Sequence, residues 1–110
     1  MSDEQARRVG LNESIFRQVN EQIESLNRDR GTGAAMTVVC ECADGECAAR
    51  LEISLTEYEK VRADPRRYII APGHELPEFG SVVESRDSYH VVQKVDGTAA
   101  ALAEETDPRS

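Results

Sequence analysis

Three cysteines lie within one short stretch of this chain, at Cys40, Cys42 and Cys47. Thiolate sulfur is a strong ligand for zinc, and a closed structural zinc site needs four protein ligands. The fourth candidate is His74, which follows Pro72-Gly73, the signal of a type II turn with a fixed shape. A small chain gains much of its folding free energy from such a site, so this pattern constrains the fold more than any other feature.

The spacing of the cysteines allows them to reach one ion. Alternate residues of a strand point to the same face, so the side chains of Cys40 and Cys42 can both reach one ion. The turn signal Asp44-Gly45 reverses the chain and brings Cys47 back to the same point. The predicted ligands are therefore Cys40, Cys42, Cys47 and His74. The predicted ion is zinc in a structural role, with iron as the alternative metal for soft ligands.

Other interpretations of the same stretch stay open. His90, Asp44 and Glu46 are alternative fourth ligands, although His90 lies within a predicted strand, where a structural histidine is more usual. The cysteines can also be metal-free thiols or take part in redox chemistry. Acidic neighbours such as Glu41 raise the pKa of a thiol, which disfavours a reactive thiolate. A catalytic zinc needs an open position and a base, for which Glu75 is the candidate.

Length and charge limit the class of protein. The chain has 110 residues and a net charge of −8, from 13 basic and 21 acidic side chains. No segment is basic, so direct contact with nucleic-acid phosphates is not expected. A basic protein partner suits this surface, but acidic domains are common and often simply soluble, and charge alone favours that second interpretation. No signal-peptide core and no membrane-spanning apolar run is present. We expect a cytoplasmic protein whose thiols bind a metal instead of forming a disulfide.

Apolar periodicity predicts the first helix. The helix is expected over about residues 12–29, with Asn12 as its cap and Gly31 as its end. The positions expected to face the core are Ile15, Phe16, Val19, Ile23 and Leu26. With Val9, most of them also fit a heptad, which is too short for a typical coiled coil. Docking on the sheet is favoured, and the chain is expected to be a monomer or a weak homodimer through this helix.

The middle of the chain alternates between strand and turn signals. Residues 37–42 and 50–55 are predicted strands of one hairpin. The capping box that starts at Ser54 predicts a helix over about 55–63, with Leu55, Tyr58 and Val61 facing inward. Further strands are predicted over 68–71 and 88–95, and Val82 and Val83 belong to a short strand or a covering loop.

These elements predict an α+β fold. The N-terminal helix and the short second helix are expected to pack on a small, mostly antiparallel sheet with a structural zinc site. Residues 1–9 are predicted to be flexible, 10–95 to form a single domain, and 96–110 to be a disordered acidic tail, because that tail has no apolar rhythm.

Several motifs together resemble a group of short, uncharacterised bacterial proteins. The motifs are Asn12 to Glu21, Cys40-Glu-Cys42 with Cys47 and Arg50, Leu55 to Pro65, Pro72-Gly73-His74-Glu75 and Tyr89 to Lys94. The resemblance covers residues 7–94. It implies an intracellular stand-alone domain in which the cysteines and His74 form one set, and it supplies no mechanism.

The sequence therefore favours a non-catalytic function. We expect a small zinc-stabilised binding or regulatory domain that engages a protein partner. The alternative is a thiol-based redox or metal-responsive switch, and a small zinc hydrolase is the third candidate.

Overall fold

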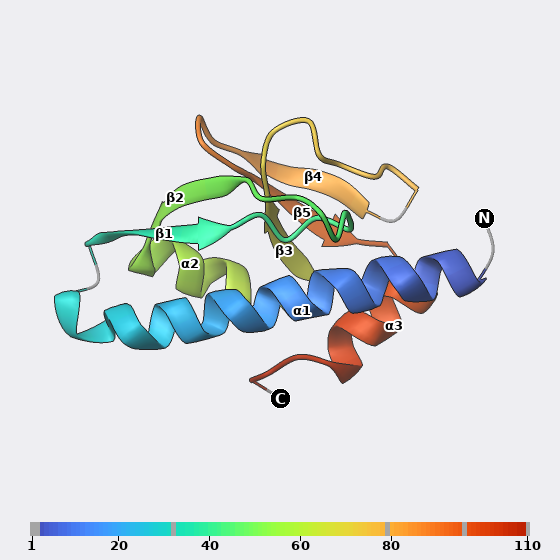
Figure 1. The fold of residues 1–110 in the computed structure, drawn as a ribbon, viewed down its shortest axis with the longest axis horizontal. Coiled ribbons are helices and arrows are strands. Elements are labelled where there is room, and N and C mark those ends of the chain that lie inside the picture. Colours follow the sequence, from blue (N-terminus) through green and yellow to red (C-terminus); the bar gives the residue numbers. More distant parts are fainter. Residues whose placement is uncertain (1–2, 32, 79, 96, 110) are drawn as a thin grey trace.

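The computed structural model describes residues 3–31, 33–78, 80–95 and 97–109, and it has the α+β architecture expected from the sequence. A long N-terminal helix and two short helices accompany two small antiparallel sheets (Figure 1). In chain order the elements are α1 (Asp3–Asn27), the 3-10 turn η1 (Arg28–Arg30), β1 (Ala35–Val39), β2 (Arg50–Ser54), α2 (Leu55–Arg62), β3 (Arg67–Ile70), β4 (Gly80–Ser85), β5 (His90–Lys94) and α3 (Thr98–Glu105).

The predicted first hairpin is confirmed as the antiparallel pair β1 and β2. Met36 and Val38 lie opposite Ile53 and Leu51, and all four side chains are buried because alternate residues share the core face. The ladder ends at Val39, earlier than expected from the sequence. Beyond that point the chain leaves β2 and turns toward β3, which determines where the cysteines lie.

The second sheet has the strand order β3-β5-β4, and both of its pairs are antiparallel. Tyr68, Ile69 and Ile70 are all buried, so β3 is covered on both faces. Val82 and Val83 belong to the edge strand β4, where the pairing register shifts between Val82 and Glu84. A bulge of this kind makes an exposed edge a poor template for pairing with another strand.

The helix α2 begins where its capping residues predict. The Ser54 side chain accepts a hydrogen bond from the backbone N–H of Glu57 at 3.1 Å. Leu55, Tyr58 and Val61 are buried, as expected from their helical spacing. This local signal was sufficient because the cap and the apolar face agree.

The orientation predicted for α1 is wrong. Ile15, Val19 and Leu26 are 59%, 41% and 83% exposed, while Phe16 and Ile23 are only half-buried. The helix instead buries a largely polar face made of Gly10, Glu13, Ser14, Arg17, Asn20 and Glu24. Both faces recur with the same helical period, so periodicity alone could not decide between them.

Arg17 illustrates why this polar face can be buried. Its guanidinium donates hydrogen bonds to the carbonyl oxygens of Pro65 at 2.7 Å and Ala103 at 2.8 Å. It also lies 4.8 Å from the centre of the Tyr68 ring. Burial of a charged group is costly unless hydrogen bonds to the protein replace those to water. The Pro65 and Ala103 carbonyl oxygens provide this replacement for Nη1 and Nη2 of Arg17.

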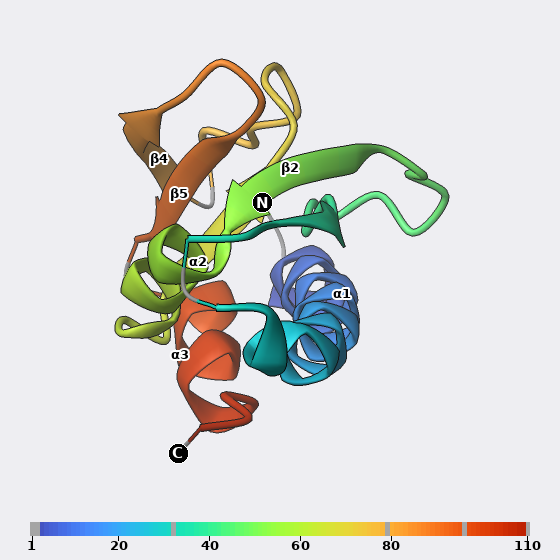
Figure 2. The ribbon, with the colours of Figure 1, turned by 90° about the vertical axis from the view of Figure 1, so that its left-hand side faces the viewer.

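The chain ends are more ordered than the sequence suggested. Residues 3–9, expected to be flexible, form the first turns of α1, and part of the expected tail is α3. Ala99, Ala100, Leu102 and Ala103 are buried where α3 lies beside α1 (Figure 2). A Cβ atom at Gly10 would lie 2.9 Å from Leu102 Cδ1, so glycine permits this close approach. Positions 1, 2, 96 and 110 of the predicted ends lie outside the described residues.

Within the described ranges, no helix combines the length and apolar character needed to cross a membrane.

Candidate metal centre

The three cysteines and His74 come from two loops that the backbone holds together. After β1 the N–H of Cys40 bonds to Ala49 O at 3.1 Å, and the next N–H, of Glu41, bonds to Ile69 O at 2.8 Å. The segment therefore passes from β2 to β3 within two residues. This places the sulfur-bearing loop beside the end of β3, where His74 follows.

A tight turn presents His74. The N–H of His74 bonds to Ala71 O at 3.1 Å, and Gly73 has a φ of 91°. A type II turn requires a positive φ at its third position, which glycine adopts without steric cost. The type II turn predicted at Pro72-Gly73 is therefore confirmed. Its rigid shape fixes the backbone position from which the His74 side chain extends.

The candidate ligand atoms converge. The sulfur atoms of Cys40, Cys42 and Cys47 and a ring nitrogen of His74 all lie within 4.8 Å of one another. His74 Nδ1 is 3.6 Å from the sulfur of Cys40 and 3.6 Å from that of Cys47. Zinc ligands at their usual bond lengths in tetrahedral directions leave sulfur and nitrogen about 3.6 Å apart. The spacing is compatible with a metal site.

The cluster is buried on one side and open on the other. Cys40 and Cys42 are buried, Cys47 is half-buried and His74 is exposed. The backbone N–H of Ala71 donates to Cys40 Sγ at 3.1 Å. Such an outer contact orients a thiolate and offsets part of its negative charge, as is common around metal ligands.

Burial also sets the protonation of the thiols. It raises the pKa of Cys40 to about 12 and raises the pKa of Cys42 as well. The sequence predicts raised thiol pKa values from acidic neighbours. The pKa values are indeed raised, but the main cause is burial. Without a metal these thiols are protonated at neutral pH, so a bound dication must displace their protons.

Two of the alternative ligands, His90 and Asp44, form hydrogen bonds to other groups. His90 Nδ1 is 2.7 Å from Glu75 Oε1, and that oxygen also accepts the Gly73 N–H at 3.0 Å. The hydrogen bond from His90 holds the pKa of Glu75 below its usual value. Asp44 accepts the N–H of Glu46 at 2.9 Å. Among the described residues, the group that can hold a metal at this place is the predicted set.

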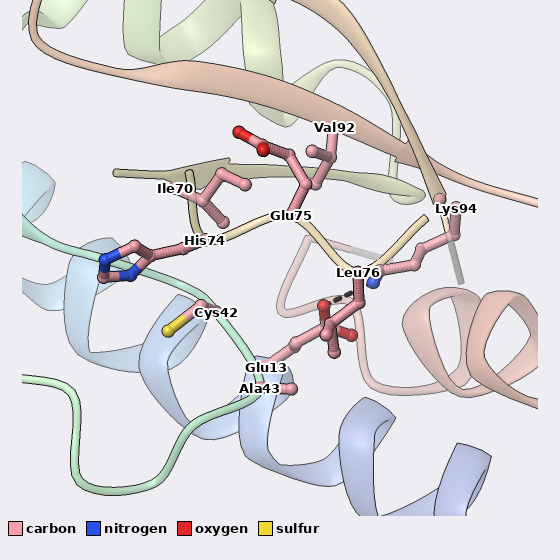
Figure 3. A pocket seen from close by; sticks show the side chains of 10 residues that line it. Glu13, Cys42, Ala43, Ile70, His74, Glu75, Leu76, Val92 and Lys94 are labelled. Carbon is pink, nitrogen blue, oxygen red and sulfur yellow. Dashed lines mark hydrogen bonds and ion pairs between the residues drawn. The ribbon is translucent and has the colours of Figure 1, made fainter. Parts of the chain in front are cut away.

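A buried ion pair lies next to the cluster of three cysteines and His74. Figure 3 shows Glu13 of α1 and Lys94 of β5 in contact, with Leu76 beside them and Cys42 nearby. Both side chains are buried, and burial raises the pKa of Glu13 to about 7 despite the attraction of Lys94. The cavity between this pair and His74 measures about 10 Å³, close to the space that one water molecule needs.

Sequence reasoning missed the polar residues that hold the sulfur-bearing segment. The amide of Asn20 bonds to both backbone groups of Val39, at 2.8 Å each, and donates to Glu41 at 2.7 Å. The available signal was the polar stripe at 13, 17, 20 and 24, which has helical spacing. Polar side chains ordinarily face water, so this stripe alone does not predict a buried face.

Comparison of the chain with protein-family models, curated proteins and solved structures found no match. The site itself therefore carries the functional inference, and the resemblance to short bacterial proteins stays a prediction.

Proposed function

We propose that this protein is a non-catalytic, zinc-stabilised binding domain. The observation that carries the proposal is the convergence of four donor atoms, from Cys40, Cys42, Cys47 and His74, within 4.8 Å. Three thiolates and one imidazole form a complete tetrahedral shell for zinc. Soft sulfur ligands also disfavour magnesium and calcium, which prefer oxygen.

A structural role suits this ligand set better than a catalytic one. Catalytic zinc usually has three protein ligands and keeps one position for water or substrate, whereas four protein ligands close the shell. A groove of about 270 Å³ is lined by the same loops and includes the acids Asp44 and Glu75. Asp44 already accepts the N–H of Glu46, and Glu75 is hydrogen-bonded to His90. We therefore assign no general base at this site.

The proposed zinc would link two segments that have little regular structure. Residues 40–49 connect β1 to β2 without forming a helix or strand, and His74 lies in the loop between β3 and β4. A metal that bridges them restricts the unfolded chain and fixes the native loops, so its binding free energy becomes folding free energy.

The binding role is supported by the surface. The net charge of −8 favours a basic partner. We propose a protein partner that meets this acidic surface, acting in the cytoplasm.

Native mass spectrometry of the reduced, purified protein tests the proposal. We expect one zinc ion per chain with no oxidised thiol. The variant Cys47→Ser should lose the metal and much of its helical circular dichroism signal, and a chelator should have the same effect on the wild type. A chain that carries no metal and folds normally would contradict the structural role.

The same measurement separates the redox alternative, which the closeness of the three sulfur atoms favours. Treatment with a peroxide would convert two thiols to one disulfide and the peroxide to water or alcohol. The chain would then lose about 2 Da, and a thiol reductant would restore the mass. This result in a metal-free protein would favour the switch over the zinc-stabilised domain.

A further inference from the structure

The outer face of α1 carries no charge over four turns. The exposed residues between Leu11 and Leu26, all of which the structure describes, are Leu11, Ile15, Gln18, Val19, Gln22, Ser25 and Leu26. Charged residues make up 31% of the chain, so an exposed helix face of this length without one is unusual for a solvated surface. We refer to these seven residues as the outer face.

The charged residues of the same span point the other way. They are Glu13, Arg17, Glu21 and Glu24, and each has a partner in a distant part of the chain. Glu13 pairs with Lys94, and Arg17 donates to the carbonyl oxygens of Pro65 and Ala103. Arg109 pairs with both Glu21 and Glu24. Figure 2 looks along α1 and shows α3 and the sheets on its inner side. The helix is thus inverted relative to an ordinary surface helix, whose polar side faces water.

We propose that a second copy of this chain covers the outer face, with the two α1 helices antiparallel. A two-fold axis between Gln18 and Val19 places Leu11 of one chain opposite Leu26 of the other. The same operation places Arg8 opposite Asp29, and both of these residues are exposed at the ends of the face. Near the axis Ile15 lies opposite Gln22 and Gln18 lies opposite Val19. Apolar side chains therefore meet each other at the two ends of the contact, where Arg8 also meets Asp29, and the same surface serves both chains.

Two features favour a second copy over other occupants. The face extends for about 22 Å along the helix axis, long enough for a helix-to-helix contact with apolar residues at both ends. An anionic membrane surface would be repelled by the net charge of −8. The proposal does not depend on the metal, because none of the outer-face residues is a candidate ligand.

Sedimentation of the full chain over a range of concentrations tests the self-association. We expect a concentration-dependent dimer for the wild type. Ile15→Glu should weaken it at least tenfold while leaving the circular dichroism spectrum unchanged. The matched control, Val83→Glu on the edge strand β4, should dimerise like the wild type. A wild type that remains monomeric, or a dimer that survives Ile15→Glu, overturns the proposal.

Charge reversal tests the antiparallel arrangement. Arg8→Asp and Asp29→Arg should each weaken the dimer about tenfold at low salt, because each variant faces like charges twice in its own dimer. An equimolar mixture of the two variants pairs opposite charges at both ends, so it should recover the wild-type affinity as a heterodimer. If the mixture associates no better than either variant alone, the antiparallel arrangement is wrong.

Discussion

Glu41 lies between two candidate metal ligands, and its side chain points away from them. Its carboxylate accepts hydrogen bonds from Arg62 at 2.9 Å, from Asn20 at 2.7 Å and from the Ile69 N–H at 2.9 Å. Because alternate residues of an extended chain face opposite sides, Cys40 and Cys42 face the metal cluster while Glu41 enters the core. Three consecutive residues thus join the candidate metal site to a buried ion pair.

This arrangement predicts a large effect of Glu41→Gln. The change leaves the buried charge of Arg62 without its counter-ion, and breaking such a pair costs about 3–5 kcal/mol. Urea unfolding of the metal-loaded protein measures the loss. The control, Glu46→Gln, alters an exposed acid of the same loop and should change the free energy of unfolding by less than about 0.5 kcal/mol. Equal stabilities of the two variants would show that the pair does not support the fold.

The two histidines provide a matched test of the ligand set. His74→Gln removes a candidate ligand from an exposed position and should lower zinc affinity at least about tenfold. His90→Gln removes the imidazole that contacts Glu75 and should leave zinc affinity unchanged. Competition with a chromophoric chelator measures both values. The assignment of His74 is wrong if the two variants lose affinity equally.

Glu13 predicts a pH dependence with a definite sign. Its pKa is raised to about 7 in the folded chain, so the folded state binds a proton that the unfolded state releases between about pH 4.5 and 7. Its contribution to stability is therefore present below pH 4.5 and is lost as the pH rises to 7. We expect the wild type to lose up to about 3 kcal/mol relative to Glu13→Gln across this window. Denaturant unfolding of both proteins at about pH 5 and pH 8 measures this difference, and parallel pH profiles would contradict it.

At the scale of elements, the face that each helix buries decides the fold. The helix α2 could be predicted because its cap and its apolar stripe are both local. The extent and orientation of α1 could not, since its buried side is set by partners such as Lys94 and Arg109 that come from distant parts of the chain. Hydrophobicity was a poor guide where every inward charge finds an opposite charge or a carbonyl group.

The helix α3 escaped prediction for a related reason. Its alanines give no strong apolar pattern, and their burial depends on the close contact with Gly10 of α1. The candidate metal site, in contrast, was predicted with its fourth member, because cysteine spacing and the Pro72-Gly73 turn are local signals. The network of Asn20, Glu41 and Arg62 needed knowledge of which side of the strand faces the core.

The packing of α3 leads to a stability prediction. Leu102 is 6% exposed, and Leu102→Ala should destabilise the protein by about 2–4 kcal/mol because it leaves a cavity between α3 and α1. Glu105→Ala in the same helix alters an exposed side chain and should stay within about 0.5 kcal/mol of the wild type. Thermal unfolding followed by circular dichroism measures both. A disordered tail would tolerate both changes equally, so equal melting temperatures would contradict the packed helix.

At the scale of the whole molecule, two kinds of interaction join the parts. One apolar core extends from Met36 of β1 to Val92 of β5, and it includes Cys40 and Cys42 themselves. Buried polar contacts then attach α1 to this core. The candidate metal site lies where the first hairpin meets the β3 turn, so metal binding would stabilise the contact between the two sheets.

The most direct measurement is X-ray absorption spectroscopy at the zinc edge of the purified, reduced protein. The account predicts one zinc per chain, bound by three sulfur atoms at about 2.3 Å and one nitrogen at about 2.0–2.1 Å. A shell made mainly of oxygen or nitrogen, or one with fewer than three sulfur atoms in a stoichiometrically loaded protein, would contradict it.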